Sequence, residues 1–267
     1  MAGLTGKTIS SSFKSLLRVD DDANGIDTSI ETVTDGEGTA SALRLSDDVV
    51  QIFPQNDDTT ATFSVRAKGG AGLLTVDSTN SVVKAGVGQF NVLTQYAYFV
   101  FNYSNNASLA ANTHYPIAFG GANGGTSATN DVDFGTGTDP DDTFTTADTN
   151  TQYASQIVPF MWFVPDNISI DSVYSIQGAD ASGGDTTRMH LKSFTFNNGS
   201  TSCLTAGELL ANSGDTTNAG NEQAYGKVWT INKASVTGGK VVLAFFRSDS
   251  VNSDYAYQIV VKYHITG

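Results

Sequence analysis

The sequence predicts an all-β protein, in which an intertwined trimeric β shaft is followed by a C-terminal antiparallel β-sandwich knob of jelly-roll type. Short alternating apolar segments separated by tight polar turns predict strands. The chain of 267 residues has 27 Gly and only 15% charged residues, and it is crowded with Thr, Ser, Asn and Asp. These polar side chains compete with the helical backbone for hydrogen bonds, so we expect little helix.

Residues 1–46 are predicted to form an N-terminal docking segment, because a chain end is normally frayed unless something holds it. Its apolar residues after Ser10–Ser12 follow i, i+3 and i+4 spacing, which suits either a short helical turn or an extended chain. The acidic run that ends in Asn24-Gly25 predicts a polar turn. The residues expected to make the docking contacts are Leu4, Ile9, Phe13, Leu16 and Leu17.

Residues 47–88 are predicted to form the shaft. Their strands carry two or three apolar side chains each and are separated by turns at Asn56–Asp58, Gly69–Gly72 and Ser78–Asn80. Isolated hairpins of this size are at best marginally stable in water. Three copies wound about one axis would share a core that no single copy owns. The residues expected in that core are Val49, Ile52, Phe63, Val65, Leu74, Val76 and Val82.

Residues 89–267 are predicted to form the knob. Short aromatic and apolar runs alternate with Gly, Asn, Asp and Ser, which is typical of an antiparallel sandwich. We expect about eight strands. Besides the aromatic run at 96–101, the expected strands include 157–164, 168–176, 188–196, 227–231, 240–247 and 255–265.

A long acidic loop between Ala118 and Thr151 is the most unusual part of this knob. Such a loop is uncommon inside a compact domain, and we expect it to be ordered by a neighbouring chain. Its carboxylates could offer oxygen ligands to Ca²⁺, but their spacing does not match a twelve-residue calcium loop, so solvated turns are favoured. The residues concerned are Asp131, Asp133, Asp139, Asp141 and Asp142.

No catalytic or cofactor-binding constellation is predicted, and we expect a protein that is not an enzyme. His114, His190 and His264 lie far apart in the sequence and are expected to be hydrogen-bonded strand residues. No pairing of carboxylates for glycoside hydrolysis can be read from the sequence. The lone Cys203 excludes an intrachain disulfide, and we interpret it as a small buried hydrophobe.

The formal charge of −13, from 27 acidic and 14 basic residues, argues against nucleic acid and acidic membranes as partners. No apolar run approaches the length of a membrane-spanning helix. Exposed aromatics could stack on host sugars, and Trp162 and Trp229 are the candidate glycan contacts. Both lie in strand-like apolar runs, so core packing is the favoured interpretation.

The shaft region resembles a known family through its motifs. Thr62-Phe63-Ser64-Val65, a Gly-rich turn, Leu73–Asp77, Asn80–Val83 and Gly86-Val87-Gly88 resemble the repeating pattern of trimeric bacteriophage fibre shafts. The opening Leu4–Ile9, with Leu16–Val19 and Asp35–Ser46, looks like the N-terminal region of marine-phage structural proteins. The resemblance covers about the first third of the chain.

This resemblance implies a homotrimeric structural protein on the surface of a tailed-phage virion, docked by its N-terminal region on a major capsid or tail protein. A capsid decoration protein or head fibre is slightly favoured, because the chain is short for a receptor-reaching tail fibre. A tail fibre with a glycan-binding knob is the alternative. A secreted carbohydrate-binding sandwich ranks third, and a signal peptide or a stable monomer would favour it.

Overall fold

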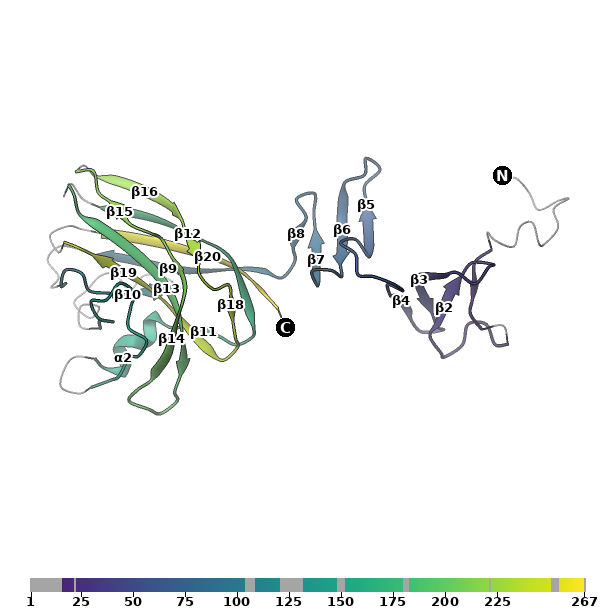
Figure 1. Ribbon diagram of the computed structural model, residues 1–267, viewed down its shortest axis with the longest axis horizontal. Coiled ribbons are helices and arrows are strands. Elements are labelled where there is room, and N and C mark those ends of the chain that lie inside the picture. Colours follow the sequence, from purple (N-terminus) through teal and green to yellow (C-terminus); the bar gives the residue numbers. More distant parts are fainter. Residues whose placement is uncertain are drawn as a thin grey trace. The chain divides into compact units, whose positions relative to one another are not determined.

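The computed structural model describes residues 16–21, 23–103, 109–120, 132–147, 152–179, 183–220, 222–250 and 255–266. The chain divides into two compact units, Met1–Leu93 and Thr94–Gly267, which we describe separately (Figure 1). Nearly all regular structure is antiparallel strand. Helix in the described ranges is confined to Ala154–Ile157 (α2) and the 3₁₀ turn Val158–Phe160 (η3), so the all-β prediction is confirmed.

The first sheet of the N-terminal unit has the order β1-β2-β3-β4. Its strands are β1 Arg18–Val19, β2 Glu31–Thr34, β3 Ala40–Leu45 and β4 Val50–Ile52. Leu43 pairs with Ile52 and Leu45 with Val50, so these four apolar side chains share one face. The domain boundary predicted between residues 46 and 47 falls inside this sheet, because β3 and β4 pair across it.

The second sheet has the order β5-β6-β7-β8. Its strands are β5 Phe63–Arg66, β6 Gly72–Asp77, β7 Val82–Ala85 and β8 Phe90–Asn91. The turn after β6 is held by Asp77, which accepts hydrogen bonds from the backbone N–H of Asn80 and from Lys84 Nζ at 2.7 Å. These bonds, that of Lys84 above all, lower the pKa of Asp77 to about 2. Because β8 pairs with β7, the unit continues past the predicted boundary at 88 to Leu93.

Neither sheet of the N-terminal unit encloses a hydrophobic core. Among its described residues Val33 is the one buried apolar side chain, and the others that are buried, Thr34, Thr75 and Asp77, are polar or charged. Both hydrophobic clusters of the described chain consist of residues from Ala97 onward. The trimeric arrangement of the shaft remains a prediction.

The C-terminal unit is a sandwich of two antiparallel layers, visible in Figure 1 as long strands crossing its full length. The front layer, which we call the front sheet, has the order β16-β12-β20-β9, and β9 also pairs with β10 of the back sheet, so the two layers are continuous. In the back sheet β19 pairs with β11, β10 and β13, and β13 pairs with β14. Taken in chain order, this pairing is that of a jelly roll, so the predicted fold of the knob is confirmed. The strands are β9 Thr94–Tyr103, β10 Tyr115–Phe119, β11 Trp162–Val164, β12 Ile168–Ala179, β13 Thr186–Phe196, β14 Leu204–Asn212, β15 Thr216–Thr217, β16 Gln223–Val228, β17 Thr230–Ile231, β18 Ser235–Val236, β19 Lys240–Ser248 and β20 Tyr255–Ile265.

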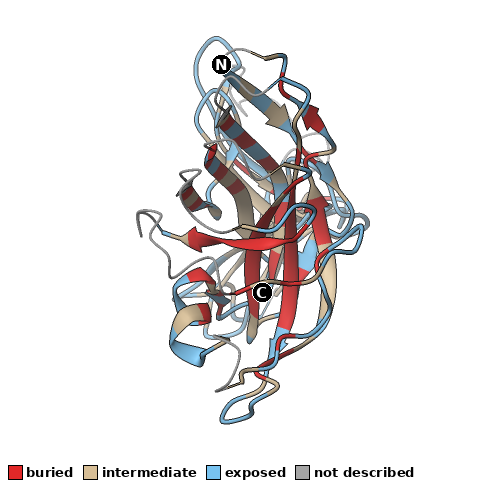
Figure 2. Cartoon of the chain, turned by 90° about the vertical axis from the view of Figure 1, so that its left-hand side faces the viewer, coloured by how far each residue is buried: buried red, intermediate tan, exposed pale blue. Residues whose placement is uncertain are grey.

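The main core lies between the two sheets and is rich in aromatic rings, such as Phe101, Phe246 and Tyr257. Figure 2 shows this burial as red segments along the long strands. A second cluster covers the outer face of the back sheet, where Phe134 and Phe144 pack near Phe194 and Phe245. Phe134 and Phe144 belong to the acidic loop, so the described part of that loop packs on the sheet of its own chain. The expected contact of this loop with a neighbouring chain remains a prediction.

Most predicted strands of the knob are found with small shifts, and 255–265 is β20 itself. The predicted strand 157–164 is wrong in its first half. There the chain forms α2 and η3, with Pro159 near the start of the 3₁₀ turn, and only Trp162–Val164 pairs with β19. Proline lacks the N–H that a central strand needs and suits the first turn of a helix.

Candidate functional site

An uncovered apolar face on the second N-terminal sheet corresponds to the predicted shaft core. Phe63 faces Val76, and Val76 faces Val83; Val65 faces Leu74, which faces Ala85, which faces Phe90. Residues directly opposite in an antiparallel pair lie on the same side of the sheet. We call this surface the shaft face, and its residues are Phe63, Val65, Leu74, Val76, Val83, Ala85 and Phe90.

Three residues predicted for the shaft core do not lie on this face. Val82 faces Asp77, so its side chain projects to the opposite, polar side, and its neighbour Val83 takes the predicted place. Val49 precedes β4 and is exposed, whereas Val50 pairs within that sheet. Ile52 lies on the apolar face of the first sheet and not on the shaft face. A slip of one residue along a strand moves a side chain to the other face.

The predicted docking residues are only partly described. Leu4, Ile9 and Phe13 lie outside the described residues. Leu16 and Leu17 are both exposed, Leu17 to 73%. Two neighbouring exposed leucines are consistent with contact to another protein, but the docking contacts remain a prediction.

The described aspartates of the acidic loop do not converge on one point. Asp133 accepts a hydrogen bond from the backbone N–H of Gly135, Asp139 lies 3.4 Å from His190, and Asp142 pairs with Lys192 at 2.5 Å. Asp141 lies close to Gly135, and Asp131 is outside the described residues. Within the described ranges no group of three or more His, Cys, Asp or Glu residues is placed to hold a metal ion.

The two tryptophans belong to the core of the sandwich. Trp162 and Trp229 are 6% and 5% exposed, and Trp229 Nε1 donates a hydrogen bond to Ser175 Oγ at 2.9 Å. A ring enclosed in this way cannot stack on a sugar, so their assignment as glycan contacts is wrong and the alternative interpretation as core residues is confirmed. Cys203 is buried and free, as expected, and burial raises the pKa of its thiol.

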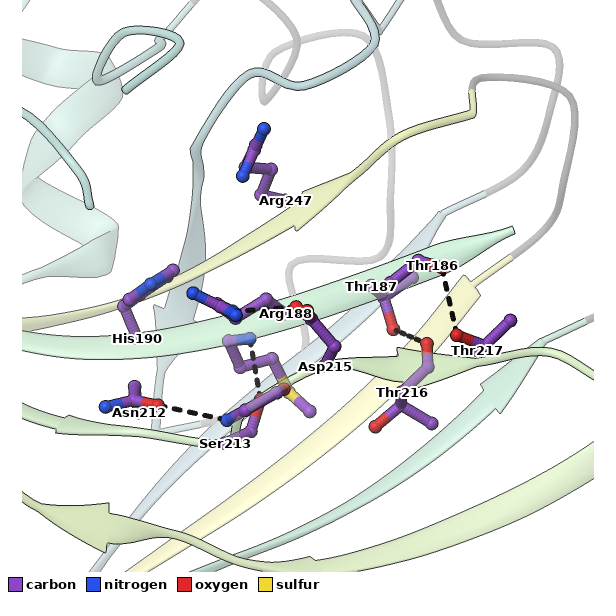
Figure 3. Close-up of polar contacts among 12 residues, drawn as sticks. Thr186, Thr187, Arg188, His190, Asn212, Ser213, Asp215, Thr216, Thr217 and Arg247 are labelled. Atoms are coloured by element: carbon purple, nitrogen blue, oxygen red, sulfur yellow. Dashed lines mark hydrogen bonds and ion pairs between the residues drawn. The ribbon is translucent and has the colours of Figure 1, made fainter. Parts of the chain in front are cut away.

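A basic row runs along the outer face of β13. Arg188, His190 and Lys192 alternate along the strand and therefore point to the same side. Directly opposite Arg188 on the neighbouring strand β19 is Arg247, so two guanidinium groups come from facing positions. Figure 3 shows Arg188 beside Asp215 near the threonines at the end of β13, with Arg247 on the neighbouring strand. Like charges directly opposite in a sheet are destabilising unless something compensates them.

These arginines line a polar pocket of about 240 Å³. Arg188 Nε donates a hydrogen bond to Asp215 at 2.8 Å. The described contacts of Arg247 are both to Asn112, one to its backbone carbonyl at 3.2 Å and one to its side-chain oxygen at 2.8 Å. Arg188 thus has a carboxylate partner and Arg247 has an amide partner. The lining residues are Asn112, Thr186, Thr187, Arg188, Asp215, Arg247 and Asp249.

His190 of this row packs against a second buried histidine, His114. The rings of His114 and His190 meet edge to face, with their centroids 5.0 Å apart, and both are fully buried. Nδ1 of His114 lies 3.2 Å from the carbonyl of Gly135. Nε2 of His114 and both ring nitrogens of His190 have no hydrogen-bond partner among the described residues. Burial, with smaller contributions from neighbouring cations such as Arg247, lowers the pKa of His114 to about 4 and that of His190 to about 3.

This arrangement of cationic side chains can bind an anion. Guanidinium groups bind carboxylates and phosphates in a planar, bidentate manner. Sequence reasoning missed the site, because His114 and Arg247 reach β13 from distant parts of the chain. The alternation of Arg188, His190 and Lys192 within one predicted strand was the available signal.

We compared the chain with protein families, curated proteins and solved structures. No family model and no curated protein matches the sequence. Among solved structures, "Structure of Eiger TNF from S. frugiperda" covers 65% of this chain and 95% of its own, with 10% sequence identity and a TM-score of 0.26. In the described ranges the structure has no helix of the length and apolarity that a membrane span requires.

Proposed function

We propose that this chain is a non-enzymatic structural protein of a tailed bacteriophage particle. It is a homotrimer at the virion surface, with an N-terminal region docked on another virion protein, a β shaft shared by the three copies, and a jelly-roll knob facing outward. We favour a capsid decoration protein or head fibre.

The observation that carries this proposal is the absence of a core in the described N-terminal unit. Its second sheet presents seven apolar residues on one face, and Phe63, Val65 and Phe90 among them are 39%, 43% and 69% exposed. Exposed contiguous apolar surface of this kind marks an interaction site. Identical copies are the economical partners, because closed symmetry covers the same face in every chain at once.

The proposal is tested first by the mass of the purified full chain in light scattering. We expect three times the mass of one chain. A monomer at all accessible concentrations would remove the homotrimer.

The second test is the place of the chain on the particle. Purified protein should bind to phage heads from which it has been stripped, and electron microscopy should find it at the head surface. Binding to tails but not to heads would replace the head assignment with the tail-fibre alternative, and binding to neither would contradict the virion role.

A tail fibre with a receptor-binding knob is the second candidate, and the arginine pocket favours it. Its ligand would carry a carboxylate for Arg247 and hydroxyls for Thr186 and Asp249, as an acidic sugar does. Calorimetry with glucuronate should then give binding that glucose lacks and that Arg247→Gln removes. The matched control is Arg66→Gln at an exposed position of β5, and equal heats for both sugars would exclude this ligand class.

A further inference from the structure

The outer face of the front sheet is a second apolar surface, and it lies in the unit that already has its own core. Successive residues of a strand alternate between the two faces of a sheet. The side chains opposite to the core on β9, β12, β16 and β20 include seven apolar residues, next to polar ones such as Gln258 and Lys262. We call this surface the front face, and its apolar residues are Tyr96, Tyr98, Val100, Tyr174, Ile176, Val228 and Val260.

Strand register places four of these residues in one row across the sheet. Val228 faces Tyr174, Tyr174 faces Val260, and Val260 faces Tyr98. Tyr98, Tyr174 and Val228 are 46%, 45% and 70% exposed, although they border one another. Ile176 on the next row is 57% exposed. A continuous row of this kind differs from the scattered single apolar residues of an ordinary surface.

The front face is also almost free of negative charge. Its four strands contain a single carboxylate, Asp171, and that group pairs with His264 at 2.8 Å. The chain as a whole carries 27 acidic residues and a formal charge of −13. Two copies of such a chain repel each other over most of their surface, so a face without unpaired carboxylates is the surface on which like copies can meet.

Chain connectivity brings the front faces of associated copies near each other. Strand β8 ends at Asn91 and β9 begins at Thr94, so the Cα atoms of these two residues are separated by at most about 11 Å. In copies that share their shaft sheets, the first residues of each knob must therefore lie close to the common symmetry axis. The first residues to enter each knob include Tyr96 and Tyr98 of the front face.

We propose that the front faces of three copies converge on the symmetry axis and form a second, knob-to-knob interface. This inference rests on the proposed homotrimer and extends it from the shaft to the knob. The occupant of the front face is a further copy of this chain. Tyr174 and Val260 at the middle of the row lie at the centre of the interface, and Tyr96 lies towards its shaft end.

The experiment measures the accessibility of individual tyrosines in the assembled full chain. Nitration with tetranitromethane, read by peptide mass spectrometry, should modify Tyr98 and Tyr174 much more slowly than Tyr153. Tyr153 is the internal reference, since it is 40% exposed at the start of α2, away from the front face. In a single chain the three rings have similar exposure, so a difference in rate reports on association.

A variant pair supplies the second measurement. Replacing Tyr98 and Tyr174 together by Asp should make the trimer dissociate at higher protein concentration in light scattering. Phe163→Asp is the matched control, because Phe163 is 55% exposed on β11 of the back sheet, and it should leave the trimer unchanged. Circular dichroism of both variants should match that of the unchanged chain, since all three side chains lie outside the core.

The outcomes separate this inference from the proposed function. The knob interface would be overturned if Tyr98 and Tyr174 of the trimer react as fast as Tyr153 and if the double variant assembles normally. The proposed shaft interface would then still stand. A chain that is monomeric at every concentration would overturn both.

Discussion

Individual residues in the knob make its stability dependent on pH. His114 and His190 are buried near Arg188, Arg247 and Lys192, with the carboxylate of Asp139 3.4 Å from His190. Burial keeps both rings neutral and lowers their pKa values to about 4 and about 3, from 6.5 for a free side chain. Below pH 6.5 the unfolded chain binds protons that the folded chain does not, so stability falls as the pH falls.

The expected result is a loss of stability that starts near pH 6.5 and continues towards pH 4. Each histidine that differs in protonation between the two states adds a slope of about 1.4 kcal/mol per pH unit. His190→Gln should therefore make the free energy of unfolding depend less steeply on pH, independently of its effect on stability at pH 7.5. Urea unfolding of the full chain at several pH values measures this, and a wild-type midpoint that is constant from pH 7.5 to 4.5 would refute the mechanism.

At the level of single elements, strand β5 offers a test of the proposed trimer at two adjacent positions. Val65 lies on the shaft face and Ser64 on the opposite side of the same strand, and both are exposed in one chain. Val65→Asp would place an unpaired carboxylate in the shared core of the trimer, at a cost of about 3 kcal/mol or more per chain. We expect it to dissociate the trimer in light scattering, whereas Ser64→Asp should not. Equal behaviour of the two variants would mean that the shaft face is not the interface.

For single strands, sequence patterns predict some features and leave others open. Alternation along β6 correctly placed Leu74 and Val76 on one face, because the side-chain period of a strand is fixed. It could not choose between Val82 and Val83, since that choice depends on the register of the turn between β6 and β7. Pro159 in the apolar run 157–164 was a local signal that periodicity alone ignored.

The candidate site was less predictable than the fold. The pocket needs Arg188 opposite Arg247 and His114 against His190, and these contacts join segments far apart in the chain. Nothing local in the sequence encodes such pairings. Burial of Trp162 and Trp229, by contrast, follows from the apolar runs in which they stand.

The whole molecule combines a unit that has a core with a unit whose described residues form none, and protease digestion should reveal the difference. Lys and Arg in the N-terminal unit include Arg66, Lys68 and Lys84, and neither residue type occurs again before Arg188. Arg188 itself lies in β13, within the sandwich. Trypsin that acts on an opened shaft should therefore leave one large fragment that begins after Lys84 and contains all of the knob.

If the proposed trimer forms, this cleavage should depend on assembly, because in the proposed trimer the other copies cover and protect the shaft strands. Proteolysis of a core-free segment follows the population of its open form. Val65→Asp should accelerate cleavage after Arg66, Lys68 and Lys84, while Ser64→Asp should behave as the unchanged chain does. Gel and mass analysis of a digestion time course distinguishes the cases. If the shaft of a dissociated chain resisted trypsin as well as the knob does, the N-terminal unit would be stable on its own, and the physical reason for assembly would be lost.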